Sequence, residues 1–194
     1  MRSTRYIIIE AEETHKKKDG SIEILERFEN QEKVNQFQKI VSVPKRFEGK
    51  FEEGDLICIH FNVLRYERKN GVKTMSPNYI KDNFYYIPDH QAHFVVKKDG
   101  SLFFFKQDCL IEGRIGREEV ITSFGIILPD LRKENEKKAD IMDGMIYAKG
   151  DDMDDVEVGD KVCMNKYSDY SIVFPDGKTR WLVGYNSLLF AYDQ

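Results

Sequence analysis

Val156-Glu-Val-Gly-Asp-Lys-Val-Cys-Met164 is the stretch that decides the fold, because Phe51-Glu-Glu-Gly-Asp-Leu-Ile-Cys-Ile59 repeats its pattern 105 residues earlier. Glu, Gly, Asp and Cys recur at the same places in both. Glycine readily adopts a positive φ, and an aspartate carboxylate can accept hydrogen bonds from nearby backbone N–H groups. The Gly-Asp pair therefore predicts a tight turn that leads into a strand. We expect equivalent turns at Gly54, Asp55, Gly159 and Asp160.

The similarity continues outside these two stretches. Lys39-Ile-Val-Ser-Val-Pro44 aligns without a gap with Gly144-Met-Ile-Tyr-Ala-Lys149, and an offset of 98 aligns Asp89-His-Gln-Ala-His-Phe94 with Ser187-Leu-Leu-Phe-Ala-Tyr192. Two matches in the same order indicate an internal repeat. The offset falls from 105 in the first match to 98 in the second. The first copy is therefore expected to have a longer connection between the two matched stretches, around Arg65–Lys81.

The composition favours strands throughout the chain. It contains 13 Phe and 10 Tyr, and short apolar runs alternate with turn signals such as Asp99-Gly100 and Asp176-Gly177. A sheet of about five short strands can remove its open edges by closing into a barrel. The sequence therefore predicts an all-β fold with two small barrels in tandem, residues 1–97 and 98–194, divided at the turn Lys97-Lys-Asp-Gly100.

Composition also excludes several classes of protein. A net charge of -4 does not favour nucleic acid or an anionic membrane as the partner, and no apolar run approaches the ~18 residues of a membrane span. The chain has three cysteines, an odd number that lie far apart in sequence. This spacing fits a reducing cytoplasm better than a disulfide framework.

No catalytic constellation or cofactor motif is visible, so we expect neither an enzyme nor a cofactor. His90 and His93 could share a metal only on a helix, and they lie at the start of a predicted strand without a third ligand nearby. Asp151-Asp-Met-Asp-Asp155 lacks the glycine and closing glutamate of a calcium loop, so we expect a solvated turn. Cys58 and Cys163 are expected to serve in packing.

A family resemblance covers residues 124–192. Gly144-Met-Ile-Tyr-Ala-Lys-Gly150, followed by Val156-Glu-Val-Gly-Asp-Lys-Val162, resembles the signature of GroES-type co-chaperonins. Upstream, Ser123-Phe-Gly-Ile-Ile-Leu-Pro129 resembles the core of that family's mobile loop. Downstream, Trp181-Leu-Val183 and Ser187-Leu-Leu-Phe-Ala191 resemble its closing strands. The first half shows the same order more faintly, and fused pairs of such barrels occur in the family.

The resemblance implies a partner and a binding site. Family members form homo-oligomeric rings that cap a GroEL-like chaperonin ring during its ATP cycle and help to enclose an unfolded client protein. It implies that residues 116–140 are a disordered loop and that the chaperonin binds its apolar part. The candidate binding residues are Phe124, Gly125, Ile126, Ile127 and Leu128, with Ile22 and Ile24 at the matching place in the first copy. The apolar pattern of Ile126-Ile127-Leu128 alone favours an ordinary core strand instead.

One departure from the family pattern concerns the roof. Only Lys45–Glu52 and Asp151–Glu157 separate the repeated strand from the Gly-Asp turn, which is too short for a roof hairpin. Both copies therefore resemble the roofless co-chaperonin of T-even phages, and the many Lys, Asn, Ile and Tyr residues suit a bacteriophage. The alternative function is a phage virion or assembly protein that reuses the barrel without binding a chaperonin.

Overall fold

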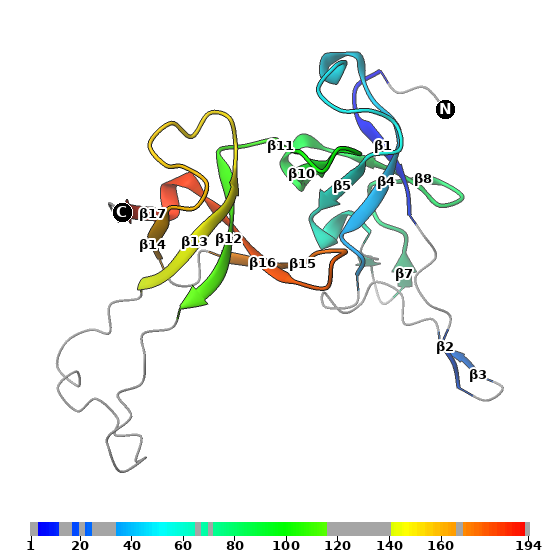
Figure 1. The fold of residues 1–194 in the computed structure, drawn as a ribbon. Coiled ribbons are helices and arrows are strands. Elements are labelled where there is room, and N and C mark those ends of the chain that lie inside the picture. Colours follow the sequence, from blue (N-terminus) through cyan, green and yellow to red (C-terminus); the bar gives the residue numbers. More distant parts are fainter. Residues whose placement is uncertain are drawn as a thin grey trace, which may run out of the picture. The chain divides into compact units, whose positions relative to one another are not determined.

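The computed structural model describes residues 4–11, 17–19, 22–24, 34–64, 67–69, 72–115, 141–165 and 169–192. The chain divides into two compact units, Met1–Phe105 (unit 1) and Lys106–Gln194 (unit 2), each built on one large antiparallel sheet (Figure 1). Besides strands, the described residues contain only short 3-10 turns: η2 (Lys45–Phe47), η3 (Phe61–Val63), η4 (Asp89–Gln91) and η6 (Tyr185–Ser187). The predicted all-β class is confirmed.

Unit 1 contains a seven-stranded sheet. Its spatial order is β11 (Leu102–Phe104), β10 (Ala92–Val96), β5 (Leu56–Ile59), β4 (Phe37–Ser42), β1 (Ile7–Glu10), β9 (Phe84–Ile87) and β8 (Tyr79–Lys81). Two hairpins lie outside this sheet: β2 (Lys17–Asp19) with β3 (Ile22–Ile24), and β6 (Glu67–Lys69) with β7 (Val72–Thr74). The second hairpin occupies the connection that the sequence predicted to be longer in the first copy.

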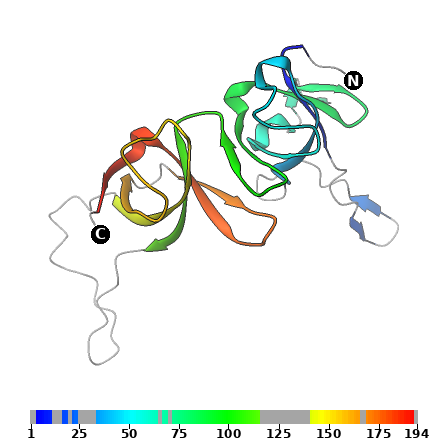
Figure 2. The same cartoon turned by 45° about the horizontal axis from the view of Figure 1, so that its top comes forward.

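Unit 2 contains a six-stranded sheet with the same arrangement. Its spatial order is β17 (Leu188–Ala191), β14 (Lys161–Asn165), β13 (Ile141–Lys149), β12 (Asp108–Ile115), β16 (Thr179–Gly184) and β15 (Asp169–Val173). This order matches that of unit 1 from β10 to β8, strand for strand, and each sheet curls round on itself (Figure 2). The chain therefore consists of two tandem β-barrel-like domains. Within the seven-stranded sheet, only β11 has no counterpart among the described strands of unit 2.

Strand pairing corrects the first alignment by one residue. The N–H of Gly54 donates to the carbonyl oxygen of Ile40 at 2.8 Å, and the N–H of Gly159 donates to that of Ile146 at 2.9 Å. Ile146 therefore corresponds to Ile40, not to Val41 as the ungapped alignment had it. The difference arises because the loop before the turn is one residue longer in unit 1.

The second alignment is wrong by two residues. Phe94 pairs with Cys58, and Phe190 pairs with Cys163. Since the two cysteines occupy equivalent strand positions, Phe94 corresponds to Phe190 and not to Tyr192. Ala92 likewise pairs with Ile59, and Leu188 pairs with Met164, so the offset between these strands is 96 instead of 98.

The turn at Lys97–Gly100, where the sequence placed the boundary between residues 1–97 and 98–194, lies inside unit 1. It connects β10 to β11, and Phe94 pairs directly with Phe104. Phe103 and Phe105 pack with Phe47 and Phe51 in one aromatic cluster, with ring centroids 5.3 to 6.3 Å apart. Because these aromatic side chains pack against the first barrel, unit 1 extends to Phe105.

Each unit has its own hydrophobic core. The core of unit 1 is rich in isoleucine and includes Ile7, Ile9, Ile40, Ile57, Ile59 and Ile87. The core of unit 2 is smaller: Cys109, Ile111, Ile146, Met153, Val156, Val162, Met164 and Val183. Burial of each such side chain contributes about 1.5–3 kcal/mol to folding. All three cysteines are buried thiols outside any disulfide, and burial raises the pKa of the Cys58 thiol well above its ordinary value.

Candidate functional site

The two Gly-Asp turns share one geometry. Gly54 and Gly159 have φ angles of +91° and +98°, a region that residues with a Cβ rarely adopt. The N–H of Glu52 donates to Oδ2 of Asp55 at 2.7 Å, and the N–H of Glu157 donates to Oδ2 of Asp160 at 2.8 Å. Each turn thus fixes the entry into the strand that follows it, β5 or β14.

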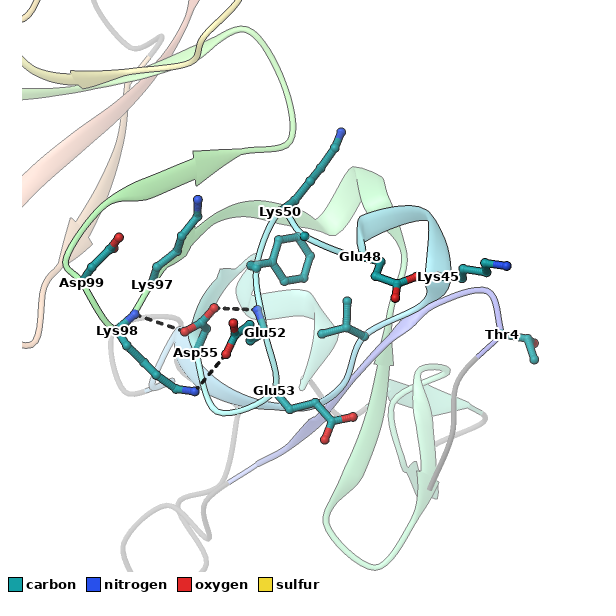
Figure 3. Close-up of a pocket in the computed structure, with 13 residues that line it drawn as sticks. Thr4, Lys45, Glu48, Lys50, Glu52, Glu53, Asp55, Lys97, Lys98 and Asp99 are labelled. Atoms are coloured by element: carbon teal, nitrogen blue, oxygen red, sulfur yellow. Dashed lines mark hydrogen bonds and ion pairs between the residues drawn. The ribbon is translucent and has the colours of Figure 1, made fainter.

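Asp55 carries a second contact that ties the turn to a neighbouring hairpin. Its Oδ1 accepts a hydrogen bond from the N–H of Lys98 at 3.1 Å (Figure 3). Asp55 is 4% exposed, whereas Asp160 is only partly buried. Loss of the Asp55 carboxylate would leave the partly buried N–H groups of Glu52 and Lys98 without this hydrogen-bond acceptor.

We therefore expect Asp55→Ala to destabilise unit 1 by about 1–3 kcal/mol, and Asp160→Ala to destabilise unit 2 by about 1 kcal/mol. Urea unfolding of the two variants, followed by fluorescence and circular dichroism, measures both free energies. Equal losses of stability in the two variants would contradict the stabilising role of the hydrogen bond between Lys98 and Asp55.

The loops that precede these turns are short. In the described residues, 43–55 hold only η2 and turns, and 150–160 hold only turns, so neither contains a strand of a roof hairpin. In the second loop, the carboxylate of Asp155 accepts a hydrogen bond from the hydroxyl of Tyr185, which raises the pKa of Tyr185. Across the described ranges, no three His, Cys, Asp or Glu side chains gather as a metal site, the acidic loop and His90 and His93 included.

Two neighbouring strands frame the candidate binding segment of unit 2. β12 and β13 are antiparallel partners, and Ile115 pairs with Asp143 near the ends of the strands that residues 116–140 connect. The segment of unit 1 that joins β1 to β4 has the corresponding place, since Glu10 pairs with Lys39. Phe124, Gly125, Ile126, Ile127 and Leu128 lie outside the described residues. Ile22 and Ile24 lie on β3, where the backbone alone is described.

A family model supplies the decisive comparison. The model of the chaperonin 10 Kd subunit matches residues 105–191. Residues 105–191 are therefore similar to a GroES-type co-chaperonin domain. This range coincides with unit 2, which begins at Lys106, and it supports a co-chaperonin-type function in general. A search of curated proteins found no match.

The match to the co-chaperonin family has two general implications. The family acts with a GroEL-like chaperonin, and it is in general not enzymatic. Except for its last residue, Phe105, unit 1 lies outside the matched range, and its sheet repeats the strand order of unit 2. No helix in the described ranges has the length and apolar character of a membrane span.

A hollow of about 1180 Å³ lies beside the first Gly-Asp turn (Figure 3). Its lining is mostly charged and includes Lys45, Glu48, Lys50, Glu52, Glu53, Lys97, Lys98 and Asp99. Both signs are interspersed, and pairs such as Lys98 and Glu52 (3.4 Å) are exposed. Exposed ion pairs contribute little energy, and this lining points to no particular ligand.

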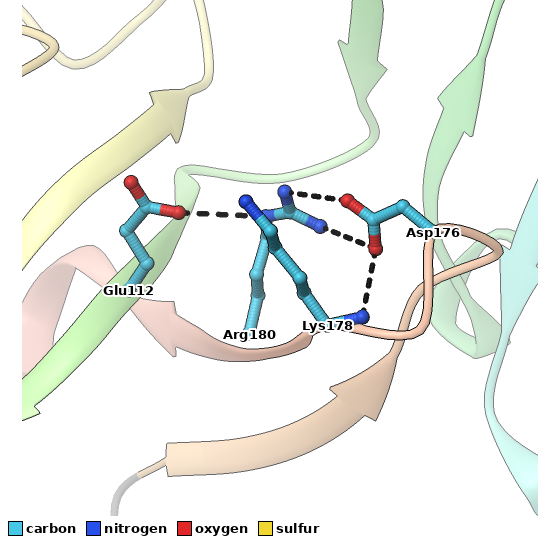
Figure 4. Close-up of polar contacts among 4 residues, drawn as sticks. All are labelled: Glu112, Asp176, Lys178 and Arg180. Carbon is cyan, nitrogen blue, oxygen red and sulfur yellow. Dashed lines mark hydrogen bonds and ion pairs between the residues drawn. The ribbon is translucent and has the colours of Figure 1, made fainter.

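Sequence reasoning missed a buried arginine in the co-chaperonin domain. Arg180 on β16 is 3% exposed, and its guanidinium lies 4.0 Å from the ring centroid of Tyr147 and 4.4 Å from that of Phe174. It donates to Asp176 at 2.9 and 3.2 Å and lies 3.8 Å from a carboxylate oxygen of Glu112 (Figure 4). Only the alternation of residues between the two faces of the predicted strand Arg180–Val183 could have indicated that the side chain of Arg180 is buried.

The contact with Arg180 predicts a dependence of stability on pH. Hydrogen bonds from the side chain of Arg180 and from the N–H of Lys178 lower the pKa of Asp176. A carboxyl group with a lowered pKa in the folded state stabilises the protein above its unfolded pKa of about 3.9, and the contribution disappears as the pH falls through the folded value. Asp176→Asn should therefore lower stability at pH 7 and change it less at pH 2.5. Equal effects at both pH values would contradict this assignment.

Proposed function

We propose that the chain is a co-chaperonin that caps a chaperonin ring during its ATP cycle and assists the enclosure and folding of a client protein. The match of residues 105–191 to the chaperonin 10 Kd subunit carries the proposal. The position of residues 116–140, between two paired strands of that domain, supports it further. The proposed setting is the cytoplasm, that of the host cell if a phage encodes the chain.

The proposed contact is made by Phe124–Leu128. These apolar residues stand between charged neighbours, Arg117–Glu119 and Arg132–Lys138. In an extended segment, Ile126 and Leu128 point to one side and Ile127 to the other, so the segment can place side chains on both walls of an apolar groove. A segment that orders on binding has low affinity for its size, which permits release. Several such segments in one assembly add avidity.

The first copy contributes less to the proposed contact. Glu23 separates Ile22 from Ile24, and a charged residue within the apolar stretch lowers the area that a groove can bury. We therefore assign the main chaperonin contact to the second copy.

Copurification with a GroEL-like chaperonin in the presence of ATP tests the proposal. We expect the chain to bind the chaperonin only with nucleotide present. We also expect bound chaperonin to slow proteolysis within residues 116–140. A chain that never binds chaperonin and resists cleavage in this segment would favour the structural role in a virion.

A further inference from the structure

Unit 1 contains an inserted hairpin that has no counterpart in unit 2. Residues 60–78 separate β5 from β8 and include the paired strands β6 and β7, whereas only residues 166–168 separate the corresponding strands β14 and β15. Among the described strands, β6 and β7 pair only with each other. An isolated two-stranded hairpin is at best marginally stable in water. The insertion therefore adds nothing to the main sheet of unit 1, which points to a role beyond folding.

The hairpin is basic in a chain that is acidic overall. Its six strand residues include three basic ones, Arg68, Lys69 and Lys73, and one acidic one, Glu67, while the net charge of the chain is -4. Arg68 pairs directly with Lys73 across the hairpin. Like charges at directly opposite positions destabilise a pair of strands. This pairing therefore favours a bound anionic group that offsets the repulsion.

The core of unit 1 holds the base of the hairpin. Val63 and Leu64, which precede the hairpin, are 0% and 1% exposed. After the hairpin, the hydroxyl of Ser76 donates to the carbonyl oxygen of Val63 at 2.6 Å, and the N–H of Asn78 donates to Oγ of Ser76 at 3.1 Å. Ser76 and Asn78 are themselves buried. The two ends of the insertion are thus joined inside unit 1, which fixes the place where the basic hairpin begins and ends.

That place lies at the end of the barrel from which the first candidate binding segment also extends. β5 ends at Ile59, whose N–H donates to the carbonyl oxygen of Gln36 at 2.9 Å. Gln36 closes the connection from β1 to β4, which contains Ile22 and Ile24. A partner that binds this connection therefore approaches the same end of unit 1 as the hairpin.

We propose that the β6–β7 hairpin is a docking site for an acidic polypeptide surface. The inference rests on the proposed function, under which that surface is an acidic patch of the chaperonin ring. In the first copy Glu23 interrupts the apolar contact, and charge attraction at the hairpin supplies part of the binding there. Nucleic acid fits less well, because its affinity depends on the neutralisation of many phosphates and the rest of the chain is negatively charged.

Substitutions at one position of the hairpin test the inference in the full chain. Lys73→Glu replaces the like-charged pair with an oppositely charged pair, so it removes basic charge without destabilising the hairpin. Lys73→Arg keeps the charge. Lys45→Glu is the matched control, because it makes the same change of charge at an exposed residue of the loop that precedes β5, whereas the hairpin follows β5. Circular dichroism and melting temperature verify that each variant is folded.

Two probes measure docking at low and at physiological ionic strength: a GroEL-like chaperonin with ATP, and fluorescent poly-L-glutamate. We expect Lys73→Glu to slow association with the chaperonin roughly fivefold or more and to weaken binding of poly-L-glutamate, and we expect salt to reduce both differences. Lys73→Arg and Lys45→Glu should bind as the unsubstituted chain does. Equal binding by Lys73→Glu and Lys45→Glu would overturn the inference, and so would a preference for duplex DNA over poly-L-glutamate.

The hairpin site and the proposed co-chaperonin function fail in different ways. A chain that binds poly-L-glutamate in a manner sensitive to Lys73→Glu, yet never binds chaperonin, would overturn the proposed function and leave the acidic-polypeptide site standing. Chaperonin binding that Lys73→Glu leaves unchanged would overturn the hairpin site alone.

Discussion

Replacing Ile127 by Asp is expected to abolish chaperonin binding while the melting temperature of the chain stays unchanged. Each apolar side chain that enters a groove contributes about 1.5–3 kcal/mol before ordering costs. A carboxylate at the same position opposes burial and reverses that contribution. The change should spare the barrel, because the segment of Ile127 lies beyond the paired ends of β12 and β13.

The matched control is Ile24→Asp in the first copy, which should weaken binding less because Glu23 already lies beside Ile24. Chaperonin affinity in the presence of ATP and melting temperature should be measured on the same samples. The competing interpretation treats Ile126, Ile127 and Leu128 as a core strand. It predicts a large fall in melting temperature, and that result would remove these residues from the proposed binding site.

Gly144→Ala is expected to destabilise unit 2 by about 1–3 kcal/mol, because a methyl group has no room at this position. A Cβ on Gly144 would lie 2.2 Å from Cγ2 of Ile111, a core residue of unit 2 with 0% exposure. Ile111 would have to move, and its neighbours in the core leave little space. In a domain of this size, each kcal/mol corresponds to about 4–8 °C in melting temperature.

Gly184→Ala serves as the control for that substitution. Its Cβ would meet only Oδ1 of Asp108, at an ordinary contact distance of 3.5 Å, and its φ of −72° suits alanine. Differential scanning calorimetry of both variants should show a lowered transition for Gly144→Ala alone. Similar transitions in the two variants would mean that β12 and β13 separate easily at this point.

The sequence predicted those parts of the fold in which a local requirement of the backbone selects one residue type. Gly54 and Gly159 need a positive φ, and each adjacent aspartate accepts a backbone N–H, so the two copies align at this place. The equivalence of Cys58 and Cys163 follows from the same stretch, and both side chains are buried.

The errors arose where distant packing decides the structure. The correspondence of Phe94 with Phe190 follows from their pairing with Cys58 and Cys163 across the sheet, which no short stretch of sequence reveals. The turn at Lys97–Gly100 has the residues of a boundary, but pairing of Phe94 with Phe104 keeps it inside unit 1. The candidate residues Phe124–Leu128 lie outside the described parts, so their role rests on sequence and family resemblance.

Covalent fusion also affects how the two barrels can diverge. Phe105 of unit 1 is followed directly by Lys106 of unit 2, so one gene product supplies both barrels in a fixed one-to-one ratio. In an assembly of single-barrel chains, one substitution alters every barrel, whereas in this chain it alters only one of each pair. Unit 1 already has an additional hairpin, β6 and β7, between its counterparts of β14 and β16. Mutations can therefore give one barrel a new function while the other barrel keeps the original function.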